Sequence, residues 1–202
     1  REGKALRETL PRSSQGAWVP SPDRPDPIDL LQAQDKGRLE HLLPIKYGRM
    51  VESPFAFLRG SAAVMAADLS STPVTGLQGQ LCGDAHLSNF GVFATPERKL
   101  VFDITDLDET YPGPWEWDLK RLAASVVVAG RENRFADQVN RKLATAASKG
   151  YSWLMRHLAK MPALDVWYYQ VQADDVLEAL EQASKKAKKS ARRMVTKARS
   201  RT

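Results

Sequence analysis

Apolar residues recur at helical spacing over most of the chain, and the spacing changes to that of strands in the middle. The clearest helical stretch is 55–69, and Gly60 inside it is an alternative signal for a break between two helices. The helices predicted from this spacing are 29–43, ended by Pro44; 55–69; one from Pro114 onward; about 135–158; and one from about Ala173 to the end.

Short strands are predicted between these helices. The first covers Gln78–Cys82. Two more, Phe90–Ala94 and Leu100–Ile104, flank the polar segment Thr95–Lys99, which is typical of a hairpin with a five-residue loop. The predicted fold class is therefore α+β, mostly helical, with a small β-hairpin.

Three regions are expected along the chain. Residues 1–27 contain Pro11, Pro20, Pro22, Pro25 and Pro27, so we expect an extended arm with no helix. Residues 28–184 hold the predicted helices and strands and form the body. Residues 185–202 contain nine Lys or Arg and no acid, which predicts a basic helical tail.

The net charge of +6 comes from this tail, and residues 1–184 carry a net charge of −3. Such a tail could hold nucleic acid or an anionic membrane by charge alone. It has no aromatic residue on which bases could stack and little apolar face for lipid. A solvated helix is the preferred interpretation, with nucleic acid a less favoured partner and no membrane role.

The chain begins at Arg1 and stops inside the basic pattern, so we expect a piece of a longer protein. No signal-peptide pattern is present, and the longest apolar run, Leu122–Ala129, is too short to cross a bilayer. Cys82 is the single cysteine, which excludes an internal disulfide. These features together predict a cytoplasmic location.

Polar residues gather around the predicted strands. Asp84 follows Gly83, where the backbone can turn tightly and expose a carboxylate that could act as a base. Asn89 and Asp106 offer an amide and a carboxylate oxygen, which are ligands that Mg²⁺ accepts. His86 lies between them and is included in the catalytic group, with support of the loop preferred over proton transfer. These groups suit phosphoryl transfer, which needs mainly positioning and charge neutralisation.

Other interpretations of these residues stay open. Asp103 could replace Asp106 as the metal ligand, although Asp106 is favoured because it lies beyond the strand end. Arg59 could bind a nucleotide phosphate or pair with a carboxylate. Asp-rich turns also occur without any metal. A two-metal hydrolase built on Asp84, His86, Asp103 and Asp106 is an alternative function.

The spacing Asp-x-x-x-x-Asn from Asp84 to Asn89 resembles the catalytic loop of protein kinases and of aminoglycoside and choline phosphotransferases. Thr105–Asp108 is similar to their metal motif, and Pro114–Leu119 is similar to their Pro-x-x-Asp-Leu segment. The resemblance implies ATP and Mg²⁺ as cofactors and Asp84 as the base. The implied metal ligands are Asn89, Asp106 and Asp108, and Asp118 is the implied structural anchor of the loop.

A nearer resemblance is to a bacterial family named domain of unknown function 2252 (DUF2252). The segments similar to it are Phe55–Gly60, Leu81–Gly91 and Trp115–Leu122. Members of this family are about twice as long as this chain, so the resemblance implies that the kinase-like domain is incomplete here. In those members the kinase-like nucleotide lobe follows the catalytic motifs, so the resemblance also implies that the two lobes occur in permuted order. The 202 residues contain no Gly-x-Gly-x-x-Gly. We therefore expect a phosphotransferase lobe for an unknown acceptor that is inactive alone, or a non-catalytic module that binds nucleotide or a partner.

Overall fold

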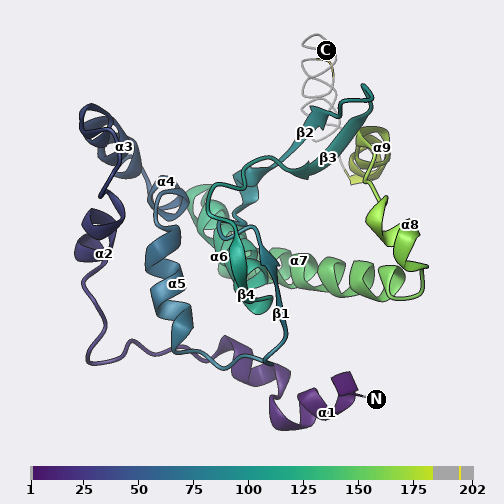
Figure 1. Ribbon diagram of the computed structural model, residues 1–202, viewed down its shortest axis with the longest axis horizontal. Helices are drawn as coiled ribbons and strands as arrows, with labels where there is room; N and C mark the ends of the chain where they lie inside the picture. Colours follow the sequence, from purple (N-terminus) through teal and green to yellow (C-terminus); the bar gives the residue numbers. More distant parts are fainter. Residues whose placement is uncertain (1, 184–195, 197–202) are drawn as a thin grey trace. The chain divides into compact units, whose positions relative to one another are not determined.

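The computed structural model describes residues 2–183 and residue 196 (Figure 1). This part of the chain is α+β, with many helices and small antiparallel sheets. The α-helices are α1 (Glu2–Thr9), α2 (Pro27–Gln34), α3 (Leu43–Met50), α4 (Pro54–Arg59), α5 (Ala62–Ser70), α6 (Glu116–Glu132), α7 (Asp137–Leu158), α8 (Ala163–Trp167) and α9 (Ala173–Ala183). The strands are β1 (Gln78–Leu81), β2 (Phe90–Ala94), β3 (Leu100–Ile104) and β4 (Tyr111–Pro114). Short 3-10 helices cover Arg12–Gly16, Glu40–Leu42 and Leu87–Asn89.

The chain divides into two compact units. Unit 1 runs to His86 and resumes over Asp108–Ser148, whereas unit 2 comprises Leu87–Leu107 and the residues from Lys149 on. Helix α7 begins in unit 1 and ends in unit 2. None of the helices in residues 2–183 combines the length and the apolar character that crossing a bilayer requires.

Unit 1 contains the antiparallel pair of β1 and β4. Its register places Leu81 opposite Tyr111 and Gln78 opposite Pro114. Leu81 is buried, and its carbonyl also accepts a hydrogen bond from the Thr110 hydroxyl at 2.5 Å. The pair therefore places the chain just after Leu81 beside the chain just before Tyr111.

A small apolar core joins the helices of unit 1. Leu31 of α2, Met50 of α3 and Val64 of α5 are buried together. The N-terminal segment is attached to α5 by Arg24, whose Nε and Nη2 donate to the two carboxylate oxygens of Asp68 at 2.6 and 2.9 Å. Such a two-point contact holds an arginine in one orientation.

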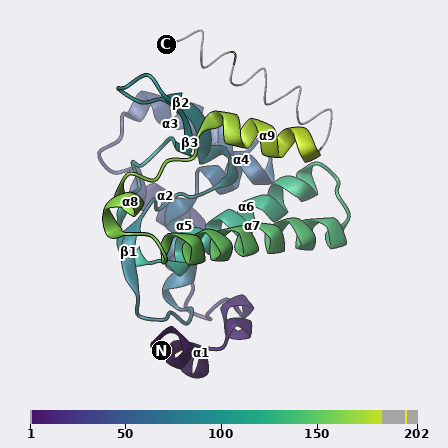
Figure 2. The same ribbon diagram turned by 90° about the vertical axis from the view of Figure 1, so that its right-hand side faces the viewer.

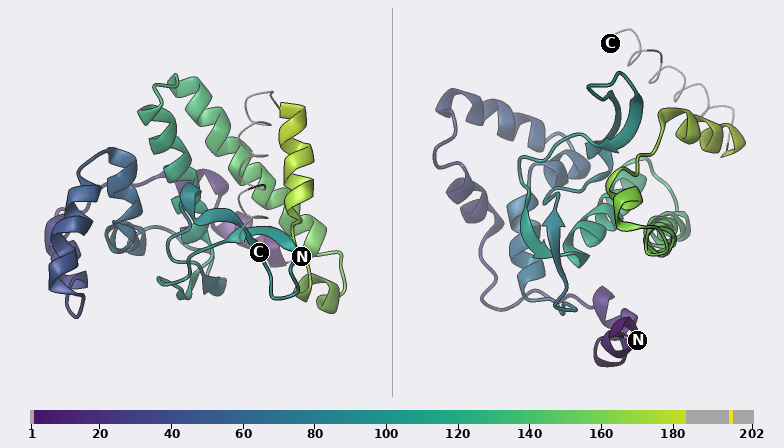
Figure 3. Two further views of the ribbon diagram at one scale, coloured as in Figure 1. Left: turned by 90° about the horizontal axis from the view of Figure 1, so that it is seen from above. Right: turned by 45° about the vertical axis from the view of Figure 1, so that its right-hand side comes forward.

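Unit 2 is built on the hairpin of β2 and β3. Its register pairs Phe90 with Ile104 and Ala94 with Leu100, and the rings of Phe90 and Phe102 stack at 6.4 Å. The segment before α9 adds to β3, because the Phe102 amide donates to the Val171 carbonyl at 2.8 Å. Figure 2 shows α9 beside the hairpin, and Figure 3 shows the hairpin from two further directions.

The hairpin over Phe90–Ala94 and Leu100–Ile104 is confirmed with its predicted bounds. The break at Gly60 is confirmed as well, since α4 ends at Arg59 and α5 begins at Ala62. The helix expected over 135–158 is present as α7. The expected basic tail, 185–202, lies outside the described residues except for residue 196.

The prediction that residues 1–27 hold no helix is wrong. Helix α1 ends at Thr9, and the first proline of the chain is Pro11. The prolines therefore come after this helix and cannot prevent it. The segment that follows contains a 3-10 helix over Arg12–Gly16.

Two predicted helix boundaries at prolines are also wrong. Pro44 was expected to end a helix, but it lies in the first turn of α3, while α2 ends at Gln34. A proline fits the first turn of a helix because the backbone N–H that it lacks would have no hydrogen-bond acceptor within the helix there. Pro114 was expected to start a helix, but it ends β4, and α6 begins at Glu116. The short helix α8 was not predicted.

Candidate functional site

Gly83 makes the turn that presents Asp84. Its φ is +81°, a conformation that L side chains rarely adopt. A Cβ at this position would lie 1.9 Å from the Glu109 carbonyl oxygen, so the two backbones approach as closely as a glycine permits. The segment Cys82–His86, here called the Asp84 loop, therefore starts with a turn that requires glycine.

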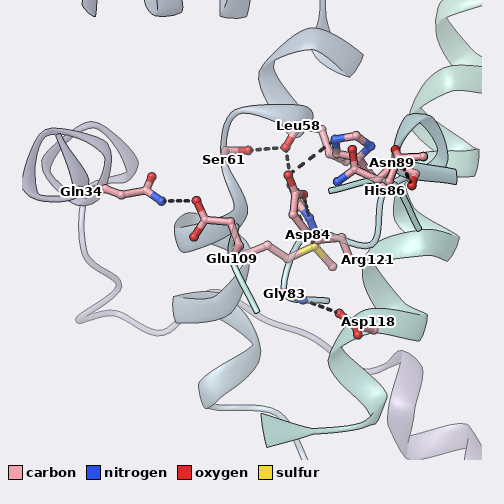
Figure 4. A network of polar contacts seen from close by, with 12 residues as sticks. Gln34, Leu58, Ser61, Gly83, Asp84, His86, Asn89, Glu109, Asp118 and Arg121 are labelled. Atoms are coloured by element: carbon pink, nitrogen blue, oxygen red, sulfur yellow. Dashed lines mark hydrogen bonds and ion pairs between the residues drawn. The ribbon is translucent and has the colours of Figure 1, made fainter. Parts of the chain in front are cut away.

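Asp118 holds the start of the Asp84 loop through its backbone. Its carboxylate accepts a hydrogen bond from the amide of Cys82 at 2.7 Å. It accepts a second one from the amide of Gly83 at 3.1 Å (Figure 4). Burial raises the pKa of Asp118, and these two hydrogen bonds oppose that rise because they favour the charged carboxylate. Asp118 lies in the first turn of α6, so the helix end also favours its charge.

Replacing Asp118 by Ala is expected to lower the free energy of unfolding by about 2–4 kcal/mol, because two loop amides lose their acceptor. Chemical denaturation of the variant measures this loss. Asp137→Ala is a matched control, since Asp137 lies in the first turn of α7 with its side chain 75% exposed. That change should cost less than about 0.5 kcal/mol. Equal losses in both variants would contradict the anchoring role of Asp118.

The Asp84 carboxylate forms a buried ion pair with Arg121 of α6. Arg121 Nε and Nη2 each lie 2.5 Å from Asp84 Oδ1, and the side chains are 3% and 14% exposed. The sequence predictions did not include Arg121. One signal was available: Arg121 follows Asp118 by three residues, so both side chains lie on the same face of α6.

His86 is buried at the end of the loop, 3% exposed, with its ring edge-on to Phe55. Its Nε2 lies 3.5 Å from Asp84 Oδ2, and its buried Nδ1 has no hydrogen-bond partner in the described part of the chain. Burial lowers the pKa of His86; the Asp84 carboxylate opposes this, and the charges of Arg121 and Arg59 add to the lowering. The burial of the ring and the two arginine charges therefore favour the neutral form of His86.

The lowered pKa of His86 predicts a stability change with pH. As the pH falls through the ordinary histidine value of 6.5, the unfolded chain takes up a proton before the folded chain does, so unfolding becomes more favourable. Denaturation from about pH 8 to about pH 5 should show this decline, and His86→Gln should make it shallower. His41→Gln, a change at an exposed position, is the control and should keep the wild-type slope. An unchanged slope in His86→Gln would contradict the assignment.

The remaining predicted residues lie in both units. In unit 1, Arg59 is exposed at the end of α4, and Asp108 is exposed before β4. In unit 2, Asn89 is buried directly before β2, and its carbonyl accepts hydrogen bonds from the Thr105 amide at 2.8 Å and the Thr105 hydroxyl at 3.1 Å. These bonds fix the backbone of Asn89 at the base of the hairpin.

The two candidate aspartates of the hairpin differ in their surroundings. Asp103 lies within β3, opposite Gly91, and its Oδ1 accepts a hydrogen bond from the adjacent Ile104 amide at 2.8 Å. Asp106 lies beyond the end of β3 and is exposed. Both carboxylates are exposed, and the preference for Asp106 over Asp103 stays a prediction.

In residues 2–183 and 196, no three His, Cys, Asp or Glu side chains gather into a metal-binding group. The ligands expected from the sequence are of another kind, an amide from Asn89 and a carboxylate from Asp106. These oxygen donors fit Mg²⁺, which takes one or two protein ligands beside phosphate oxygens and water. Both residues belong to unit 2, whereas Asp84 belongs to unit 1.

A family model matches residues 38–202 of the chain. The family, DUF2252, is described as an uncharacterised protein conserved in bacteria. The match contains the Asp84 loop, the hairpin and α6. No curated protein and no solved structure gave a match. Because the family model covers well over half of the sequence, the chain belongs to the DUF2252 family.

Proposed function

We propose that this chain is the catalytic lobe of a kinase-like phosphotransferase that uses Mg²⁺ and ATP. The observation that carries the proposal is the Asp84 loop. A short strand, a glycine turn and the Asp118 carboxylate fix its backbone, and Arg121 holds the Asp84 side chain. Phosphoryl transfer needs such a fixed carboxylate to orient an attacking hydroxyl.

In this proposal Asp84 accepts the proton of the acceptor hydroxyl while the hydroxyl oxygen bonds to the γ-phosphorus of ATP. The bond between that phosphorus and the bridging oxygen breaks, and ADP leaves with the bonding electrons. Bound Mg²⁺ would neutralise the phosphate charge, with Asn89 and Asp106 as its ligands and Asp108 nearby in sequence. Arg59 would contribute a further positive charge toward the nucleotide.

Turnover of Mg·ATP by the full-length protein tests this function. We expect release of ADP that requires Mg²⁺ and increases when the acceptor is supplied from a panel of small hydroxyl compounds. Phosphodiester hydrolysis without ATP would instead indicate the metal-dependent hydrolase. The kinase-like lobe and the permuted order of lobes are parts of the same proposal.

A second candidate is a non-catalytic kinase-like module that binds nucleotide or a partner. The ion pair between Asp84 and Arg121 favours it, because a carboxylate that is already paired with a buried cation is a weaker base. Calorimetric binding of Mg·ATP without any ADP release or phosphate transfer would support this module over the enzyme.

A further inference from the structure

Arg121 contacts three separate segments of unit 1. Its Nε donates to Asp84 Oδ1 at 2.5 Å, and its Nη2 donates to the Leu58 carbonyl at 2.6 Å. Its Nη1 lies 3.5 Å from Met65 Sδ on α5. Arg121 itself belongs to one segment of the family resemblance, 115–122, and its guanidinium contacts the two others, 55–60 through Leu58 and 81–91 through Asp84 (Figure 4).

The burial of Arg121 makes these contacts obligatory. Its side chain is 3% exposed, and a buried guanidinium without acceptors would cost several kcal/mol. The N–H donors of a guanidinium lie in one rigid plane. The hydrogen bond from Nη2 to the Leu58 carbonyl therefore fixes the orientation of that plane. The same plane then fixes Asp84 Oδ1, so the carboxylate cannot rotate without breaking the pair.

This arrangement distinguishes the two oxygens of Asp84. Oδ1 is in contact with both Nε and Nη2 of Arg121. Oδ2 faces the His86 ring and lies 3.5 Å from its Nε2. The His86 ring is buried, so it cannot move far. The carboxylate is therefore held in one orientation, with Oδ1 toward Arg121 and Oδ2 toward His86.

We propose that Arg121 is the positioning residue for the reaction, holding Asp84 so that Oδ2 takes the proton of the acceptor hydroxyl. The inference rests on the proposed phosphotransferase function. The proton moves from the hydroxyl to Oδ2, and Arg121 stays charged and bound to Oδ1 throughout. In this proposal Arg121 acts through Asp84 and contacts neither ATP nor acceptor, so we expect its effect to fall on the chemical step.

The test uses the full-length protein with Mg·ATP and compares kcat and KM for ATP in wild type, Arg121→Met and Arg121→Lys. Misplacing a reacting group by about 1 Å can cost about 100-fold in rate. We therefore expect kcat to fall by about 100-fold in Arg121→Met and by about 10-fold or more in Arg121→Lys, whose single ammonium cannot make the fork. The KM for ATP should stay within about twofold in both variants.

Arg24→Met is the matched control, because Arg24 also makes a two-point ion pair in unit 1, with Asp68, away from the Asp84 loop. We expect it to keep the wild-type kcat. A second measurement adds guanidinium at low, non-denaturing concentration to Arg121→Ala. It should restore part of kcat, and methylammonium of the same charge should not.

Each outcome decides the inference. A folded Arg121→Met with wild-type kcat overturns it, as does Arg121→Lys with full activity. If Arg121→Met does not fold, the Arg121→Lys rate and the guanidinium rescue decide in its place. Absence of ATP turnover in the wild type overturns the proposed function and this inference with it. The wild-type measurement alone gives that result, so it is distinguished from a failure of the Arg121 role.

Discussion

Replacing Asp84 by Asn should remove nearly all of the proposed Mg·ATP-dependent phosphate transfer by the full-length protein. An amide has nearly the shape of the carboxylate but cannot take up the proton of the acceptor hydroxyl. General base catalysis contributes about 10²- to 10⁴-fold, so kcat should fall by that factor. The measurement is ADP release at saturating ATP. Wild-type activity in the variant would show that Asp84 is not the base.

The structure adds a stability effect to this prediction. Asp84→Asn leaves the buried Arg121 charge without its counter-charge, which can cost up to about 3–5 kcal/mol. Activity must therefore be measured well below the unfolding temperature of the variant. Asp68→Asn is the control, since it also removes the carboxylate partner of an arginine in unit 1, and it should leave kcat unchanged.

Replacing Gly83 by Ala should cause a large loss of stability in unit 1. The new Cβ would lie 1.9 Å from the Glu109 carbonyl oxygen, and that atom belongs to the backbone and cannot rotate away. The residue would also be held at a φ of +81°. We expect a loss on the order of 4 kcal/mol or more, measured by chemical denaturation.

Gly76→Ala separates the two causes. Gly76 has the same φ of +81°, yet a Cβ there would meet nothing within 4 Å. Its replacement should cost only about 1–2 kcal/mol, the strain of the left-handed conformation. If Gly83→Ala cost no more than Gly76→Ala, the close approach of the Asp84 loop to Glu109 would be contradicted.

The sequence predicted the parts of the fold that rest on local patterns. The hairpin was found with its bounds because two apolar stretches flank a polar five-residue loop. Strand β4 was missed because Tyr111–Pro114 contains two prolines and a glycine, a composition typical of a loop. It is a strand because it pairs with β1, which lies far away in the sequence.

The candidate site shows the same limit. Asp84, Asn89 and Asp106 were selected by residue type and spacing, which are local properties of the sequence. Arg121 was missed because its role comes from contacts with Leu58 and Asp84, 63 and 37 residues away. A buried arginine at the core of unit 1 also runs against the usual exposure of charged residues. The spacing from Asp118 places Arg121 on the same helix face, but its partners are identified only when the segments are placed together.

The most direct test of the proposed phosphotransferase site is a crystal structure of the full-length protein with Mg²⁺ and a non-hydrolysable ATP analogue. We expect the Asn89 amide oxygen and an Asp106 carboxylate oxygen to lie about 2.0–2.1 Å from the ion. We also expect Asp84 Oδ2 to face the γ-phosphate from the side where the acceptor hydroxyl would bind. An ion bound without Asn89 and Asp106, or a nucleotide bound away from Asp84, would contradict the proposed site.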